Sequence, residues 1–139
     1  MPVMVSRRVA ALVLAAVALV AAGAGVYTAR LLRGGRYGEV SVGEAYGLME
    51  EGGVLPLDVR TPEEFVGGHL EGAVNIPVDK LEARLDELPR DQPLLVYSRT
   101  GNRSSRALDI LRDAGFTQVY HMSQGITAWI QEGYPTTTG

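Results

Sequence analysis

Hydrophobic and polar positions change their spacing several times along residues 39–135, which predicts strands and helices in turn. Apolar runs of the length of buried strands lie at 54–59, 73–76, 94–97 and 118–121. Helices are predicted over 42–51, 78–88, 104–114 and 126–132, and in the second of these Leu81, Leu85 and Leu88 lie on one face. Regular alternation of strand and helix predicts an α/β fold, with a parallel sheet flanked by helices on both faces.

Local signals support several of these boundaries. Residues 41–44 and 61–64 each form a capping box, and Pro62 stands at the first helical position. Gly115 is placed as a helix C-terminal glycine. Pro56 is unusual within a core strand, because proline removes a hydrogen-bond donor from the ladder.

The segment from Val9 to Val26 is an unbroken run of 18 apolar or small residues. This length is at the lower limit for spanning a bilayer and also fits the core of a signal peptide. We expect an N-terminal membrane anchor, with a signal peptide cleaved near residues 22–24 as the alternative. Either interpretation predicts a domain outside a bacterial-type cytoplasm, and the flanking arginines do not fix the orientation.

This segment also sets the predicted domain organisation. Residues 1–33 form the anchor or signal segment, 34–38 a linker, 39–135 one compact domain and 136–139 a tail. All sixteen acidic residues but only eight of the thirteen basic ones lie at or after Glu39, so the domain carries a net charge of −8.

One stretch departs from this acidic balance. No acid lies between Asp91 and Asp109, whereas Arg99, Arg103 and Arg106 do. A local cationic spot on an acidic domain favours a small bound anion and argues against nucleic acid.

The same stretch has the layout of an anion-binding loop. A buried strand at 94–97 leads into residues 98–104, and a helix follows. Gly101 and Asn102 tolerate the left-handed backbone that a sharp turn needs, so several amides can face a bound anion at the helix N-terminus. The alternative is an ordinary strand–helix turn with solvated arginines.

Three motifs carry a resemblance to the rhodanese-like, single-domain sulfurtransferase family. The first is LDVRTPEEF (57–65) followed by GHLEGAVNIP (68–77). The second is YSRTGNRS (97–104), which resembles the active loop of the family. The third is GITAW (125–129) with GYP (133–135).

The resemblance implies the fold, the position of the catalytic residue and the residues of the anion loop. In active members the first loop residue is a cysteine that carries a persulfide, and here that position is Ser98. The loop amides and basic side chains of the family fall on Arg99, Thr100, Gly101, Asn102, Arg103 and Ser104. The loop resembles the sulfurtransferases in length, since the phosphatase branch has a loop one residue longer. Gln124 departs from the glycine that is usual in the family.

Serine at position 98 changes the expected chemistry. A cysteine thiol titrates near pH 8.5, and a cationic loop lowers that value, whereas a serine hydroxyl forms no persulfide. We therefore predict a module that binds a small anion such as thiosulfate or sulfate, or a protein partner, without sulfur transfer. The alternatives are a sulfurtransferase whose cysteine has been changed to serine, and a serine-dependent hydrolase with His121 as its base.

Other candidate residues have less specific interpretations. Asp58 and Arg60 end a strand at the same sheet edge, so Arg60 is predicted either to shape the pocket mouth or to form a structural ion pair with an acid such as Glu64. His69, Phe65 and Trp129 are expected to be structural. The sequence predicts no cofactor and no metal site, because it has no cysteine and only two histidines, 52 positions apart.

Overall fold

The structure, a computed structural model, describes residues 37–139 and centres on a parallel sheet. Within the described residues the sheet has five strands in the order β1-β5-β4-β2-β3. The strands are β1 (Tyr37–Glu39), β2 (Leu55–Asp58), β3 (Val74–Asn75), β4 (Leu94–Tyr97) and β5 (Val119–His121). Every neighbouring pair is parallel, so the carboxyl ends of all strands meet at one edge.

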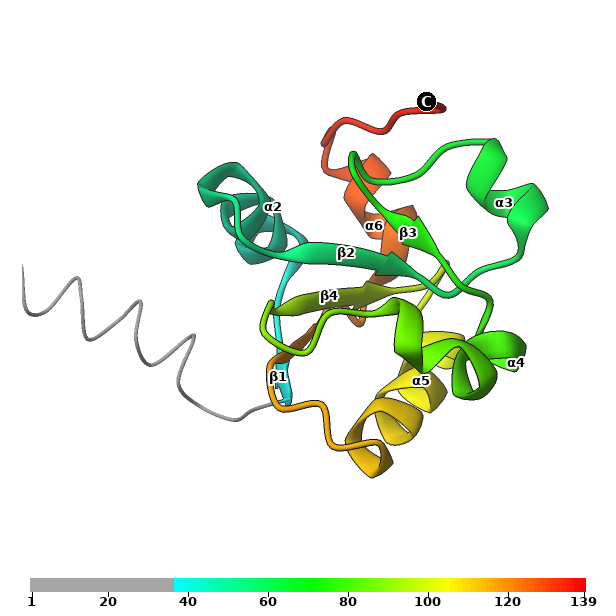
Figure 1. The fold of residues 1–139 in the computed structure, drawn as a ribbon. Coiled ribbons are helices and arrows are strands. Elements are labelled where there is room, and N and C mark those ends of the chain that lie inside the picture. The colour runs from blue at the N-terminus through cyan, green and yellow to red at the C-terminus, as the bar shows by residue number, and fades with distance from the viewer. Residues whose placement is uncertain (1–36) are drawn as a thin grey trace, which may run out of the picture. The chain divides into compact units, whose positions relative to one another are not determined.

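Helices cover both faces of this sheet, as the sequence predicted. The helices are α2 (Val42–Glu51), α3 (Pro62–Val66), α4 (Val78–Leu81), a 3₁₀ helix (Glu82–Glu87), α5 (Asn102–Asp113) and α6 (Gly125–Gln131). Helices α4 and α5 contact each other on one face, and α2 and α6 contact each other on the other (Figure 1). Both predicted capping boxes are present, at Ser41 and Thr61.

The side-chain alternation of β4 supplies both layers of the core. Leu94 and Val96 belong to a buried cluster with Ala107 and Leu111 of α5. Leu95 and Tyr97 are also fully buried, and because successive strand residues point to opposite faces they serve the other layer. Burial on both faces explains why the strand reads as a continuous apolar run.

Pro56 fits the sheet because its neighbour on one side is short. Pro56 is paired with Leu95 of β4, whereas the pairing of β2 with β3 begins only at Leu57. The amides of Leu55 and Val59 donate to the β4 side, to Pro93 and Tyr97. The nitrogen of Pro56 therefore faces the β3 side of β2, at a position where β3 has not yet begun. No hydrogen bond of the sheet is lost there.

Two predicted helices differ from those observed. The helix expected at 104–114 begins at Asn102, because Gly101 alone takes the left-handed backbone (φ 108°) and Asn102 is already helical. The helix expected at 78–88 is divided into α4 and the 3₁₀ helix, in which Arg84 leaves helical geometry (φ −124°, ψ 18°). Of the four predicted strands, β4 matches the expected bounds. Strand β5 is one residue shorter than expected, and β2 and β3 are each two residues shorter.

The predicted hydrophobic segment, its cleavage site and residues 34–36 of the predicted linker lie outside the described residues. The last two residues of that linker, 37 and 38, belong to strand β1. Among residues 37–139, no helix is both long enough and apolar enough to cross a membrane.

Candidate anion-binding loop

The predicted loop lies at the carboxyl end of the central strand β4, between β2 and β5. Two glycines let it pack, backbone against backbone, on the turn before α6. A Cβ at Gly101 would lie 2.2 Å from the Ser123 carbonyl oxygen, and one at Gly125 would lie 2.2 Å from the Arg99 carbonyl oxygen. Both glycines also have positive φ, 108° and 76°. Only glycine fits at these two positions, which explains two matched motif residues in physical terms.

Helix α6 fixes the first two carbonyl groups of the loop. The amide of Ile126 donates to the Ser98 carbonyl at 3.0 Å, and the amide of Thr127 donates to the Arg99 carbonyl at 3.2 Å. These donors belong to the first turn of α6, where helix amides lack intrahelical partners. The GITAW motif therefore holds the loop in place.

Gln124, which departs from the family pattern, is compatible with this arrangement. Its backbone is in the right-handed helical region (φ −70°, ψ −20°), so no glycine is required there. Its side-chain Oε1 accepts a hydrogen bond from the amide of Val42 at 3.4 Å, which joins the turn to the start of α2.

The hydroxyl of Ser98 is buried and fully hydrogen-bonded. Its Oγ accepts from the amides of Gly101 and Ser104, both at 3.2 Å, and donates to Ser104 Oγ at 3.1 Å. A serine hydroxyl has one donor and two acceptor positions, so all three are used. Ser98 is only 1% exposed, and its hydroxyl holds the two ends of the Gly101–Ser104 turn together.

His121 is connected to Ser98 only through Ser104. The Ser104 Oγ lies 2.7 Å from His121 Nε2, and His121 Nδ1 lies 3.8 Å from a carboxylate oxygen of Glu39. Burial lowers the pKa of His121, although the Glu39 carboxylate opposes the shift. The lowered pKa keeps the ring mainly neutral at pH 7. His121 thus lies beside the loop, but the direct Ser98–His121 pair of a serine-dependent hydrolase does not form.

Four backbone amides of the loop have no hydrogen-bond partner among the described residues. Within residues 37–139, no hydrogen bond uses the backbone amides of Arg99, Thr100, Asn102 or Arg103. These amides precede or open α5, where the helix dipole favours a negative charge. They form the part of the site that an anion can occupy.

The three arginines around the loop differ in their availability. Arg103 makes a two-pronged ion pair with Glu64 of α3, at 2.5 and 2.9 Å, and its hydrogen bond lowers the pKa of Glu64 to about 2. Arg106 lies 3.6 Å from Asp79 at an exposed position. Arg99 is exposed and forms no ion pair with any described residue. The cationic spot in the sequence is therefore reduced to Arg99, because acids from other segments neutralise its neighbours.

The pair at the end of β2 is structural. Arg60 contacts Asp58 at 2.6 Å, with both side chains buried, and also donates to the Gly68 carbonyl at 2.7 Å. The expected structural ion pair is present, with Asp58 as the partner in place of Glu64. Arg60 also lines the groove beside the loop, which agrees with the alternative that it shapes the pocket mouth. Burial raises the pKa of Tyr97, with Asp58 adding to the shift, and its hydroxyl accepts from the Leu70 amide.

The remaining candidate residues have the expected structural roles. Trp129 is 1% exposed, and its Nε1 donates to the Pro135 carbonyl. His69 is buried, stacks on Phe65 and contacts the carbonyl oxygens of Phe65 and Gly139 through its two nitrogens. In the described part of the chain, no group of three or more His, Asp or Glu residues is arranged to hold a metal ion.

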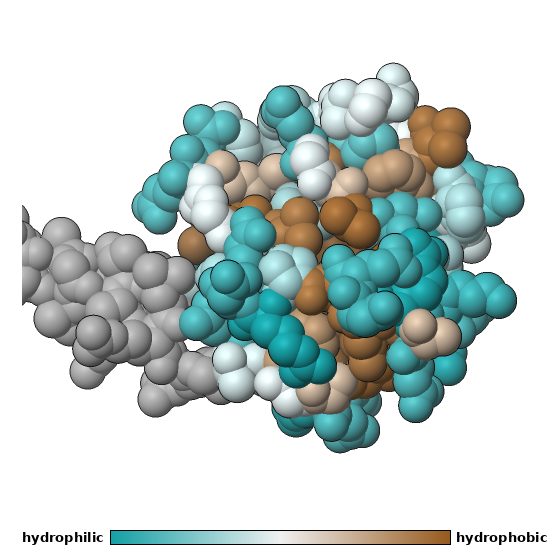
Figure 2. Space-filling model, viewed as in Figure 1, coloured by the Kyte–Doolittle hydropathy of each residue, from teal (hydrophilic) through white to brown (hydrophobic). Residues whose placement is uncertain are grey.

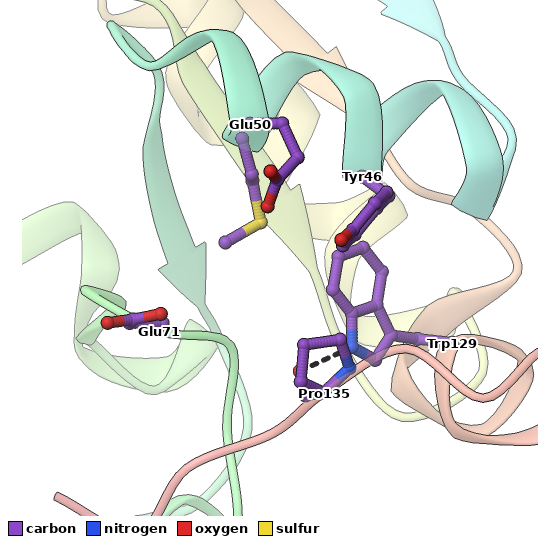
Figure 3. Close-up of a pocket in the computed structure, with 6 residues that line it drawn as sticks. Tyr46, Glu50, Glu71, Trp129 and Pro135 are labelled. Carbon is purple, nitrogen blue, oxygen red and sulfur yellow. Dashed lines mark hydrogen bonds between the residues drawn. The ribbon is translucent and has the colours of Figure 1, made fainter.

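Two hollows lie near these elements, and only one suits an anion. A cavity of about 170 Å³ lies beside α2, where Tyr46, Met49, Trp129 and Pro135 form the wall and the charged lining residues are Glu50 and Glu71 (Figure 3). A wider groove of about 420 Å³ adjoins the loop and is lined by Arg60, Arg99 and Thr136 together with residues at α3 and α6. Apart from Arg60, this lining was not foreseen from the sequence, because it is assembled from four separate segments of the chain.

Comparison with known proteins identifies the family. Residues 41–132 match the Rhodanese-like domain, and the chain belongs to this family. A sulfurtransferase of Allochromatium vinosum is 35% identical over 82 residues, which cover 59% of this chain and 77% of that protein. The uncharacterized protein YqhL of Bacillus subtilis is 42% identical over 73 residues, covering 52% of this chain and 58% of the relative.

Solved structures agree with the fold. A rhodanese-related protein from Thermoplasma volcanium has a TM-score of 0.68 and 32% identity, and the match covers 74% of this chain and 100% of that one. The rhodanese-like domain of an Anabaena protein has a TM-score of 0.68 and 28% identity, over 73% of this chain and 80% of that one. The resemblance stated from the motifs is thus confirmed for family and fold.

Proposed function

We propose that this rhodanese-like domain binds a small anion such as thiosulfate or sulfate at residues 98–104 and does not transfer sulfur. The observation that carries the proposal is the division of the loop amides into two groups. The amides of Arg99, Thr100, Asn102 and Arg103 have no partner among the described residues and can serve an anion, whereas the residue at the nucleophile position is a buried serine with a fully used hydroxyl. Serine offers no thiolate to accept sulfane sulfur.

Sulfur transfer from thiosulfate to cyanide tests this proposal, using the full chain in mild detergent beside its Ser98→Cys variant. Cysteine at position 98 would receive the amides of Gly101 and Ser104 on its sulfur, which lowers the pKa of a thiol. We expect a silent native protein and an active variant. Transfer by the native chain would overturn the proposal. Saturable shifts of the loop amides on addition of sulfate should accompany either result.

A serine-dependent hydrolase is the second candidate, and the Ser98–Ser104–His121 hydroxyl chain is the observation in its favour. In that reaction Ser98 would attack an ester carbonyl while its proton passes to Ser104 and the Ser104 proton passes to His121 Nε2. Hydrolysis of p-nitrophenyl acetate that is lost in Ser98→Ala and His121→Gln would support it. The binding function is favoured instead, because the Ser98 hydroxyl is fully used in hydrogen bonds and reaches His121 only through Ser104.

We further propose that the domain is tethered to a membrane through residues 9–26 and lies outside the cytoplasm. The basis is the 18-residue apolar run and its flanking arginines. The intact mass and first residues of the protein from membrane and periplasmic fractions test this. A full-length chain in the membrane fraction supports an anchor, whereas a chain shortened near residues 22–24 supports an exported form.

A further inference from the structure

The groove beside the loop has more room than an inorganic anion needs. Its volume of about 420 Å³ falls within the range of about 300–1,000 Å³ that is typical of organic ligand sites. Of the residues in the loop, only Arg99 lines the groove, and it can address only the few oxygen atoms of an anionic head. The remaining space must therefore suit another part of the ligand.

The charges along the groove differ between its walls. Arg99 of the loop is exposed and has no ion-pair partner among the described residues, whereas Arg60 is neutralised by Asp58. On the α3 wall, Glu64 is occupied by Arg103, and Glu63 is exposed. A negative head is therefore favoured at the loop end, and a second negative charge is disfavoured farther along.

The α6 wall is apolar where it meets the groove. Ile130 is 56% exposed and Ile126 is 4% exposed, and both line the groove. Among the described residues, the exposed large hydrophobic side chains are Ile130 and Val66. On the face shown in Figure 2, hydrophobic residues form several separate groups between polar ones. Short apolar segments on a polar surface fit a small ligand better than a broad protein interface.

We infer that the ligand of this site is an organic anion with a compact oxyanion head and an apolar tail of a few carbon atoms. The head lies at Arg99, where the loop meets the groove, and the tail lies along Ile126 and Ile130. This inference rests on the proposed anion binding at residues 98–104 and adds the class of ligand.

A series of sulfonates tests the inference on the full chain in mild detergent. Dissociation constants for sulfate, methanesulfonate, 1-propanesulfonate and 1-pentanesulfonate would be measured from amide shifts of residues 99–103. Complete burial of one methylene group raises the affinity about fourfold. In an open groove, where burial is incomplete, we expect an increase of about twofold for each methylene group. The affinity should therefore rise steadily with tail length, and 3-sulfopropanoate, with its second charge, should bind more weakly than propanesulfonate.

Two matched variants locate the tail. Ile130→Ser removes the apolar wall and should abolish the dependence on tail length. Val66→Ser makes the same kind of change on α3, at a residue 67% exposed that does not line the groove, and should leave the series unchanged. Equal effects of both variants would place the tail elsewhere and overturn the inference.

The outcomes separate this inference from the function on which it rests. If sulfate and all sulfonates bind equally well, the tail site is wrong and anion binding stands. If neither sulfate nor any sulfonate binds, both proposals are wrong. Affinity that rises with tail length but persists in Ile130→Ser also overturns the inference.

Discussion

The ends of β2 and β4 lie side by side at one sheet edge, yet their polar groups are used in opposite ways. At the end of β2, the carboxylate of Asp58 is taken up by the backbone and side chain of Arg60. At the end of β4, the amides of Gly101 and Ser104 turn inward to Ser98, and four other loop amides have no partner within the described residues. A closed polar network supports the fold, whereas donors left open make a site.

The largest effect is expected when the closed network is broken. Asp58→Ala leaves the Arg60 guanidinium buried without its counter-charge, which costs about 3–5 kcal/mol for a buried pair. Urea unfolding of the variant beside the parent chain measures this loss. Asp79→Ala, which removes an exposed carboxylate 3.6 Å from Arg106, should change the free energy of unfolding by less than about 0.5 kcal/mol. Similar losses in both variants would contradict the contrast between the two strand ends.

The support of the open loop is tested at its glycine. Gly125→Ala places a Cβ 2.2 Å from the Arg99 carbonyl oxygen at a positive φ, so we expect a loss of at least about 2 kcal/mol from strain and overlap. Gly133→Ala is the matched control, since its φ is also positive (82°) but its Cβ would meet nothing within 4 Å. The free energy of unfolding of this control should fall by only about 1 kcal/mol, the cost of placing alanine at a positive φ. Anion binding should weaken in the first variant alone.

Removal of the serine hydroxyl is expected to have a moderate effect. Ser98→Ala leaves the buried amides of Gly101 and Ser104 without their acceptor, which costs about 1–3 kcal/mol. Thermal unfolding measures the loss, and Ser105→Ala, at an exposed residue, serves as the control. If Ser98→Ala is as stable as the parent, the hydroxyl does not close the inner side of the loop.

The sequence predicted where the strands end and where the loop lies, but not the tertiary contacts of the loop residues. The strand periods, the capping boxes and the glycine at position 101 are local signals, so the fold and the location of the loop followed from them. The neutralisation of Arg103 by Glu64, 39 positions away in the sequence, depends on how α3 packs beside α5. The bridging role of Ser104 and the apolar wall at Ile130 likewise depend on tertiary contacts that no local pattern records.

The smallest effect concerns the ion pair that links α3 to the loop. Arg103 lowers the pKa of Glu64 from 4.5 to about 2, so the stabilisation is present above pH 4.5 and is lost as the pH falls toward 2. Because both side chains are about one third exposed, we expect it to amount to only about 1 kcal/mol. The melting temperatures of the parent and Glu64→Gln should therefore differ at pH 7, and the difference should shrink steadily as the pH falls from about 4.5 to about 2. Glu63→Gln, at an exposed neighbour, should follow the parent at every pH. A difference between parent and Glu64→Gln that is as large at pH 2 as at pH 7 would show that the glutamate acts through its helix cap and not through Arg103.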